Sequence, residues 1–171
     1  MKRTSQGFSL IEVLVAVLVV SIGLLGIAST LLTATSSATS SYVRQQAVQY
    51  TYDILERMRA NASVAHDPTS GNPYIVAAAA AGSAPSPNCS TATCTPAQMA
   101  AFDVWQWQSG LQADVPGGLG SVAVSAGTDN TTIVTITVTW SDQPAQTTLS
   151  RGTLSSTSTL STPTYTVTTA L

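Results

Sequence analysis

One long apolar stretch dominates the hydropathy pattern of the chain. It runs from Gly7 to Leu32, and no charged residue occurs from Val13 to Val43. A helix that crosses a bilayer needs about 20 apolar residues, so this run is long enough. A secretory signal peptide has a shorter core and a small-x-small cleavage site, which this run lacks. The pattern therefore predicts a helix that is not removed from the protein. The helix is either a plain signal anchor or an anchor with a further role.

Apolar residues continue at helical spacing after the run ends. The periodicity predicts one helix from Phe8 to about Ala60, with a length of about 80 Å at 1.5 Å per residue. Its first part is expected to span the membrane or to pack in a fibre. Its second part is expected to lay an apolar stripe on a globular head. The stripe consists of Val43, Ala47, Tyr50, Ile54 and Met58.

Two glycines lie inside the apolar part of this helix. Gly23 and Gly26 each cost about 1 kcal/mol relative to alanine in a helix interior. Close helix packing is one explanation for them, and a local loosening of the helix during assembly is the other.

Residues 62 to 95 are rich in proline and glycine, which predicts a loop region. Within it, the alanine run Ala77–Ala81 is expected to form a short turn of helix. His66 is expected to be an exposed loop residue rather than a ligand. Cys89 and Cys94 are too few for a metal site without further ligands nearby, so a disulfide is the better prediction for an exported chain.

A second helix is predicted directly after this loop. Thr95 is a typical N-cap residue, and Pro96 suits the first helical position. The helix should end before Pro116. Its apolar stripe places Trp107 in the core and leaves Trp105 as a candidate interface residue. The stripe consists of Ala100, Val104, Trp107 and Leu111.

Alternation with period two predicts strands in the rest of the chain. Val122–Ala126 and Val134–Trp140 lie on either side of a turn at Gly127–Asn130, which predicts an antiparallel hairpin. Thr147–Leu154 is a weaker candidate, and Tyr165–Leu171 is a candidate last strand. A small antiparallel sheet packed on the second half of the long helix is an α+β fold.

Composition and charge narrow the classes of function. Only 8% of the residues are charged, and the net charge is −2. Lys2 and Arg3 precede the apolar run and predict a cytoplasmic N-terminus, with the rest of the chain outside. No basic patch follows, so nucleic-acid binding is not expected. The sequence also has no catalytic set, phosphate-binding loop or metal-ligand cluster, which predicts no enzyme activity and no cofactor.

Glu12 is the one acid in the apolar run. A charge in the hydrocarbon costs about 2.5–3.5 kcal/mol, so a mere anchor would gain by losing it. No lysine or arginine lies within a helical turn on its apolar side. Cleavage between Gly7 and Phe8 would create an α-amine four residues away, on the same helical face. We therefore interpret Glu12 as an assembly device whose ion pair sets register within or between subunits.

The stretch G-F-S-L-I-E-V-L-V-A, Gly7 to Ala16, resembles the class III signal of type IV pilins and of type II secretion pseudopilins. The resemblance implies that a prepilin peptidase cuts after Gly7 and N-methylates Phe8. Glu12 matches the buried acid of that signal.

The resemblance also implies the type IV pilin fold and its division into parts. These are a leader peptide at 1–7, a transmembrane or assembly helix at 8–32, an amphipathic helix half at 33–61 and a periplasmic α+β head at 62–171. The precursor would be a single-pass inner-membrane protein that contacts lipid and the pilus assembly platform. The mature protein would then enter the pilus fibre, near its tip, beside the major pilin and other minor pilins.

The string Y-D-I-L-E-R-M-R-A-N, Tyr52 to Asn61, resembles PilV-type minor pilins, also called type IV pilus modification proteins. It implies a role in priming and assembly of type IV pili, and so in adhesion and twitching motility. Two alternatives remain, a type II secretion pseudopilin and a membrane-anchored binding module that never assembles. The charged residues of the string are expected to form a solvated face with i,i+3 and i,i+4 pairs, or a contact surface for other minor pilins. They are Asp53, Glu56, Arg57 and Arg59.

Overall fold

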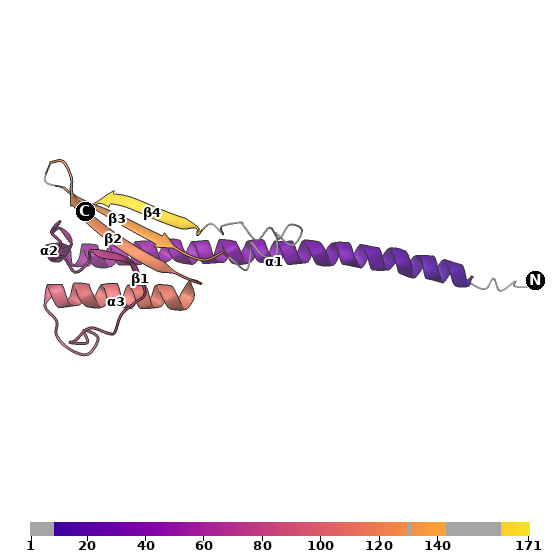
Figure 1. Cartoon of the computed structure of the whole chain (residues 1–171), viewed down its shortest axis with the longest axis horizontal. Coiled ribbons are helices and arrows are strands. Elements are labelled where there is room, and N and C mark those ends of the chain that lie inside the picture. Colours follow the sequence, from indigo (N-terminus) through magenta and orange to yellow (C-terminus); the bar gives the residue numbers. More distant parts are fainter. Residues whose placement is uncertain (1–8, 130, 143–161) are drawn as a thin grey trace, which may run out of the picture.

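The protein consists of one long helix and a small head that is built on the C-terminal half of this helix (Figure 1). The computed structural model describes residues 9–129, 131–142 and 162–171. The α+β fold expected from the sequence is confirmed. The elements are α1 (Leu10–Ala60), α2 (Ala62–Ala65), β1 (Val76–Ala79), α3 (Pro96–Asp114), β2 (Leu119–Ala126), β3 (Thr132–Thr139) and β4 (Thr164–Ala170).

Helix α1 is continuous over 51 residues and ends where the sequence predicts. It begins after Ser9, and Glu12 lies in its first turn, where a negative charge suits the positive end of the helix dipole. It ends at Asn61, whose backbone N–H donates to the carbonyls of Arg57 and Met58. The amphipathic stripe is also confirmed, since its members are buried except for Tyr50, which packs at the edge of the core.

The Ser/Thr-rich middle of α1 is helical, and several of its hydroxyls donate to backbone carbonyls one turn earlier in the helix. Thr33 donates to the carbonyl of Ser29 at 3.1 Å, and Thr39 donates to that of Thr35 at 3.0 Å. Such back-bonding satisfies the hydroxyls without breaking the helical pattern. The polar segment therefore connects the two apolar parts of α1 without interrupting the helix.

Helix α3 packs against α1 and runs antiparallel to it. Its start is fixed by a capping box, in which Thr95 accepts from the backbone N–H of Gln98 and the Gln98 side chain accepts from that of Thr95. At this end, the Asn61 amide donates to the carbonyl of Pro96 at 2.7 Å. At the other end, Asp114 meets Tyr50, ten residues back along α1 from Ala60. The predicted start and end of this helix are confirmed.

In the part of the chain that the structure describes, four strands form one antiparallel sheet in the order β1-β2-β3-β4. The predicted hairpin is β2 and β3, with Val122 opposite Ile136, and β4 then pairs with β3. One face of the sheet packs on the helices, as the strict alternation of buried and half-buried residues along β3 shows. The fully buried residues from this face and the helices include Ile54, Met58, Trp107, Leu111, Val122, Val134, Ile136 and Val138.

Gly120 in β2 allows the sheet to approach α3 closely. A Cβ atom at this position would lie 2.3 Å from the ring of Trp107, which is far closer than van der Waals contact. Trp107 is 1% exposed, and its indole N–H donates to the carbonyl of Tyr50 at 2.9 Å. From its position on α3, the side chain of Trp107 therefore contacts both α1 and β2.

Several details differ from the sequence-based expectations. The region predicted as a loop, residues 62–95, begins with the short helix α2. The alanine run forms strand β1 rather than a helical turn, because Val76–Ala79 pairs with the edge of β2. An isolated run this short cannot nucleate a helix, whereas the sheet edge satisfies its backbone groups. Strand β2 also begins at Leu119, three residues before the predicted start. The predicted leader at 1–7 and the weak strand at 147–154 lie outside the described residues.

Candidate assembly interface

The N-terminal half of α1 projects from the head and makes no core contact (Figure 1). Every large apolar side chain between Leu10 and Leu32 is exposed, from 52% for Val13 to 86% for Leu10. An 18-residue window of α1 has a mean hydropathy of 2.8 with none of it buried, so the helix is long and apolar enough to cross a membrane. Burying each such side chain yields about 1.5–3 kcal/mol. This surface therefore requires lipid or protein partners.

Glu12 is the exposed acid on this surface. Its backbone N–H donates to the carbonyl of Ser9 at 3.0 Å, as expected for the first turn of a helix. The ion pairs among the described residues all lie at or beyond Asp53, so none involves Glu12. The predicted cleavage and methylation site, Gly7 and Phe8, lies outside the described residues. The ion pair with the Phe8 amine thus stays a prediction.

Gly23 and Gly26 have open space around them among the residues that the structure describes. A Cβ atom at either position would meet nothing within 4 Å. Their lack of a side chain therefore serves no packing inside the described chain. Both positions lie on the exposed apolar half of α1, where a neighbouring helix or lipid would contact them.

Arg57 forms a polar clasp between α1 and α3. Its Nε donates to Asp53 at 3.0 Å, and its Nη1 donates to Asp103 at 3.2 Å and to Gln106 at 2.7 Å. The expected i,i+4 pair with Asp53 is confirmed, as is the i,i+3 pair of Arg59 with Glu56. Arg57, however, is not simply part of a solvated face, because α3 supplies two of its three acceptors.

Tyr74 completes the clasp from the loop before β1. Its hydroxyl donates to the second carboxylate oxygen of Asp103 at 2.9 Å, and burial raises its pKa. Sequence reasoning missed Asp103. A signal was present, since Asp103 lies three residues after Ala100 and four before Trp107, and so interrupts the apolar stripe of α3. An acid on such a stripe calls for a polar partner from another element, here the half-buried Arg57.

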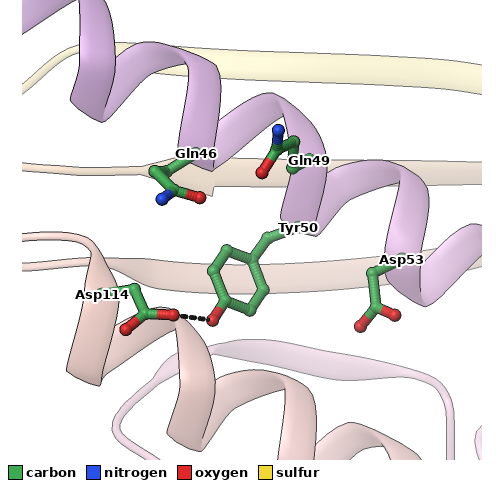
Figure 2. A pocket seen from close by; sticks show the side chains of 5 residues that line it. All are labelled: Gln46, Gln49, Tyr50, Asp53 and Asp114. Atoms are coloured by element: carbon green, nitrogen blue, oxygen red, sulfur yellow. Dashed lines mark hydrogen bonds between the residues drawn. The ribbon is translucent and has the colours of Figure 1, made fainter.

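A second polar contact joins the far end of α3 to α1. Figure 2 shows Tyr50 extending from α1 toward α3, where its hydroxyl donates to Asp114 at 2.5 Å. Burial, and then this hydrogen bond, raise the pKa of Tyr50 to about 12. A shallow pocket of about 280 Å³ surrounds the ring, and Gln46, Gln49 and Asp53 line it. This contact and the clasp both hold α3 on α1.

Three further residues singled out in the sequence lie in the head. Cys89 and Cys94 form a disulfide, as predicted. His66 is exposed, as predicted, and its Nδ1 lies 3.3 Å from the hydroxyl of Thr132. Trp105 is half-buried, and its indole N–H donates to the carbonyl of Gly82 at 3.1 Å, so its role as an interface residue stays a prediction.

An exposed apolar half-helix, joined through a polar segment to a head of one antiparallel sheet, defines the class of proteins with the type IV pilin fold. Within the residues that the structure describes, no group of three or more His, Cys, Asp or Glu side chains could hold a metal ion. The candidate interface is the exposed apolar surface of α1, residues 10–32.

Two family models match the chain and agree with this class. Residues 31–105 match the family of type IV pilin Tt1218, and residues 2–28 match the prokaryotic N-terminal methylation motif. No curated protein and no solved structure matches the chain. The two matches cover the helix and the start of the head. They imply a component of a pilus or a pseudopilus, which is a structural protein rather than an enzyme.

Proposed function

We propose that this protein is a minor pilin of the PilV type, which takes part in the priming and assembly of type IV pili. The observation that supports this most is the exposed apolar half of α1, with Glu12 as its one acid. Such a surface packs equally well in a bilayer and among neighbouring helices. The resemblance of Tyr52–Asn61 to PilV-type proteins supports the finer assignment.

In this proposal the protein passes through two states. The precursor, with leader 1–7, is anchored in the inner membrane by residues 8–32 and exposes the head, residues 62–171, to the periplasm. Residues 33–61 join the two. Prepilin peptidase then removes the leader after Gly7 and methylates Phe8. The assembly platform inserts the mature protein into the fibre, near its tip, where it supports adhesion and twitching motility.

Glu12 has the decisive role in the second state. A carboxylate in an apolar environment needs a cation partner, and the described residues supply none. The Phe8 amine of a neighbouring minor or major pilin would supply it. Apolar packing then provides affinity, and the ion pair provides register.

Two alternatives predict different partners or none. A type II secretion pseudopilin would have the same helix and signal, and would assemble with secretion components. The Tyr52–Asn61 string argues against it only moderately, because Asp53, Arg57 and Asn61 have packing roles inside the head. A binding module that never assembles would need no acid at position 12.

The experiment compares Glu12→Ala with Glu56→Ala in a strain that lacks the native gene. Glu56 is an exposed acid of the same helix, outside the apolar run, so its loss is the matched control. We expect Glu12→Ala to insert in the membrane but to fall at least tenfold in sheared filaments, with Glu56→Ala close to wild type. Normal incorporation of Glu12→Ala would contradict the proposal. Cofractionation with secretion components instead of pili would favour the pseudopilin.

A further inference from the structure

A groove of about 240 Å³ lies between α3 and the loop that follows β1. Its nine lining residues include no charged side chain. Pro73, Pro85 and Val104 supply apolar walls, and Trp105 supplies an aromatic one. The groove lies in the head, whereas the apolar half of α1 projects away from the head (Figure 1), so the groove is a second surface and not part of the assembly interface.

The aromatic wall of the groove is held in place from two sides. The indole N–H of Trp105 donates to the carbonyl of Gly82 across the loop at 3.1 Å. Its ring packs against Phe102, with the ring centroids 5.6 Å apart. Trp105 remains only half-buried. The groove therefore has a fixed aromatic surface that a ligand can reach. Its volume lies below the range of about 300–1,000 Å³ for pockets of drug-sized ligands, so it suits a smaller ligand.

Gln108 places a free hydrogen-bond acceptor at this groove. The residue is 8% exposed, and its amide N–H₂ donates to the carbonyls of Ala77 and Gly120 at 3.5 and 3.4 Å. Among the described residues, no donor reaches its Oε1. Since Gln108 lines the groove, a hydroxyl donor of a ligand bound there could use this acceptor.

We propose that this groove binds one neutral sugar ring. A pyranose has an apolar C–H face, which can lie on the Trp105 ring, and hydroxyl donors, which can reach Gln108 Oε1 and the Ser83 hydroxyl. The uncharged lining disfavours an ionic ligand, which would lose its hydration without gaining a counter-charge. The small volume holds one ring and not an extended peptide. This site is independent of the assembly role of α1.

The test uses the full chain in a detergent without a sugar headgroup, such as dodecylphosphocholine. Methyl glycosides of glucose, galactose and N-acetylglucosamine are the probes, and saturation-transfer NMR reports on ligand protons without relying on a tryptophan. We expect saturable transfer to the ring C–H protons of at least one glycoside, and weaker transfer to glucuronate. Trp105→Leu and Ser83→Ala should weaken binding at least tenfold and threefold, respectively.

Trp140→Phe is the matched control, because Trp140 lines a different pocket, with Ser40 and Arg44. It should bind the glycoside as the wild-type chain does. Ser83 is an exposed loop residue, so its substitution keeps the test valid even where Trp105→Leu disturbs the fold. The proposal is overturned by absence of transfer from every glycoside, by unchanged binding in both groove variants, or by a proline-rich peptide that binds where no glycoside does.

Discussion

Glu12 and Asp103 each place a carboxylate among apolar residues of a helix, but among the described residues only Asp103 has a charged partner. Asp103 is 8% exposed and contacts Arg57 and Tyr74 within the chain. Glu12 is exposed and has no ion pair among the described residues. The same pattern therefore has two outcomes. An acid on a stripe that the chain itself covers finds its partner inside, and an acid on an uncovered surface needs one from outside.

Gly120→Ala tests the closest packing contact of the head. The new Cβ would lie 2.3 Å from Trp107, whose ring is buried and cannot yield easily. We expect the free energy of unfolding to fall by about 1–3 kcal/mol, as for other overpacked cores. Denaturant unfolding of the full chain in detergent, followed by near-UV circular dichroism, measures it.

Gly82→Ala is the control for this experiment. A Cβ atom at Gly82 would meet nothing within 4 Å, so its effect should stay within about 0.5 kcal/mol. Equal losses from both substitutions would show that the contact with Trp107 is not what requires glycine at position 120.

Tyr50→Phe tests the contact between Tyr50 and Asp114 through its pH dependence. Burial and the hydrogen bond raise the pKa of Tyr50 from 10.0 to about 12, so the folded protein keeps the phenol proton where the unfolded chain releases it. The stability of the wild-type protein should therefore fall as pH rises from 10 to about 12. The variant lacks this loss, so its deficit at neutral pH should shrink over that window. Parallel pH profiles for the two proteins would refute the raised pKa.

At the scale of elements, the clasp of Arg57, Asp103 and Tyr74 fixes how α3 lies on α1. Asp103→Ala would leave Arg57 and Tyr74 without their shared acceptor. Hydrogen bonds to charged groups contribute about 1.5–3 kcal/mol, so we expect a loss of about 2 kcal/mol in the free energy of unfolding. Thermal and denaturant unfolding of the full chain measure this loss.

Glu56→Ala again supplies the matched comparison, because it removes an exposed acid whose ion pair among the described residues is with Arg59. Exposed pairs contribute about 0–1 kcal/mol, so this variant should unfold almost as the wild type does. If Asp103→Ala were as mild, the clasp would not determine the packing of α3.

The elements with strong local signals were predictable from the sequence. Helix α1 has a long apolar run and then an apolar stripe at helical spacing, and α3 has Thr95 and Pro96 at its start, so the ends of both helices were close to the predicted positions. Strand β1 was not predictable, because an alanine run has no period-two pattern and becomes a strand only through pairing with β2. Tertiary pairing decided its conformation, and local propensity did not.

At the scale of the molecule, the head has a hydrophobic core, whereas the apolar N-terminal half of α1 stays exposed. The α+β architecture and the apolar run followed from hydrophobic patterning. The contacts between α1 and α3 did not, because Asp103, Tyr74 and Asp114 are distant in sequence from Arg57 and Tyr50, and no local pattern pairs them. The head is stable through internal contacts, and the helix surface is left for lipid or for other subunits.

The most direct test of the assembly account is the intact mass of this protein in purified filaments. The account predicts a species whose first residue is Phe8 and which carries one added methyl group on its N-terminal amine and one disulfide. That species would contain the amine that Glu12 is proposed to meet. A filament-bound chain that still contains residues 1–7, or one whose first residue is not Phe8, would contradict the account.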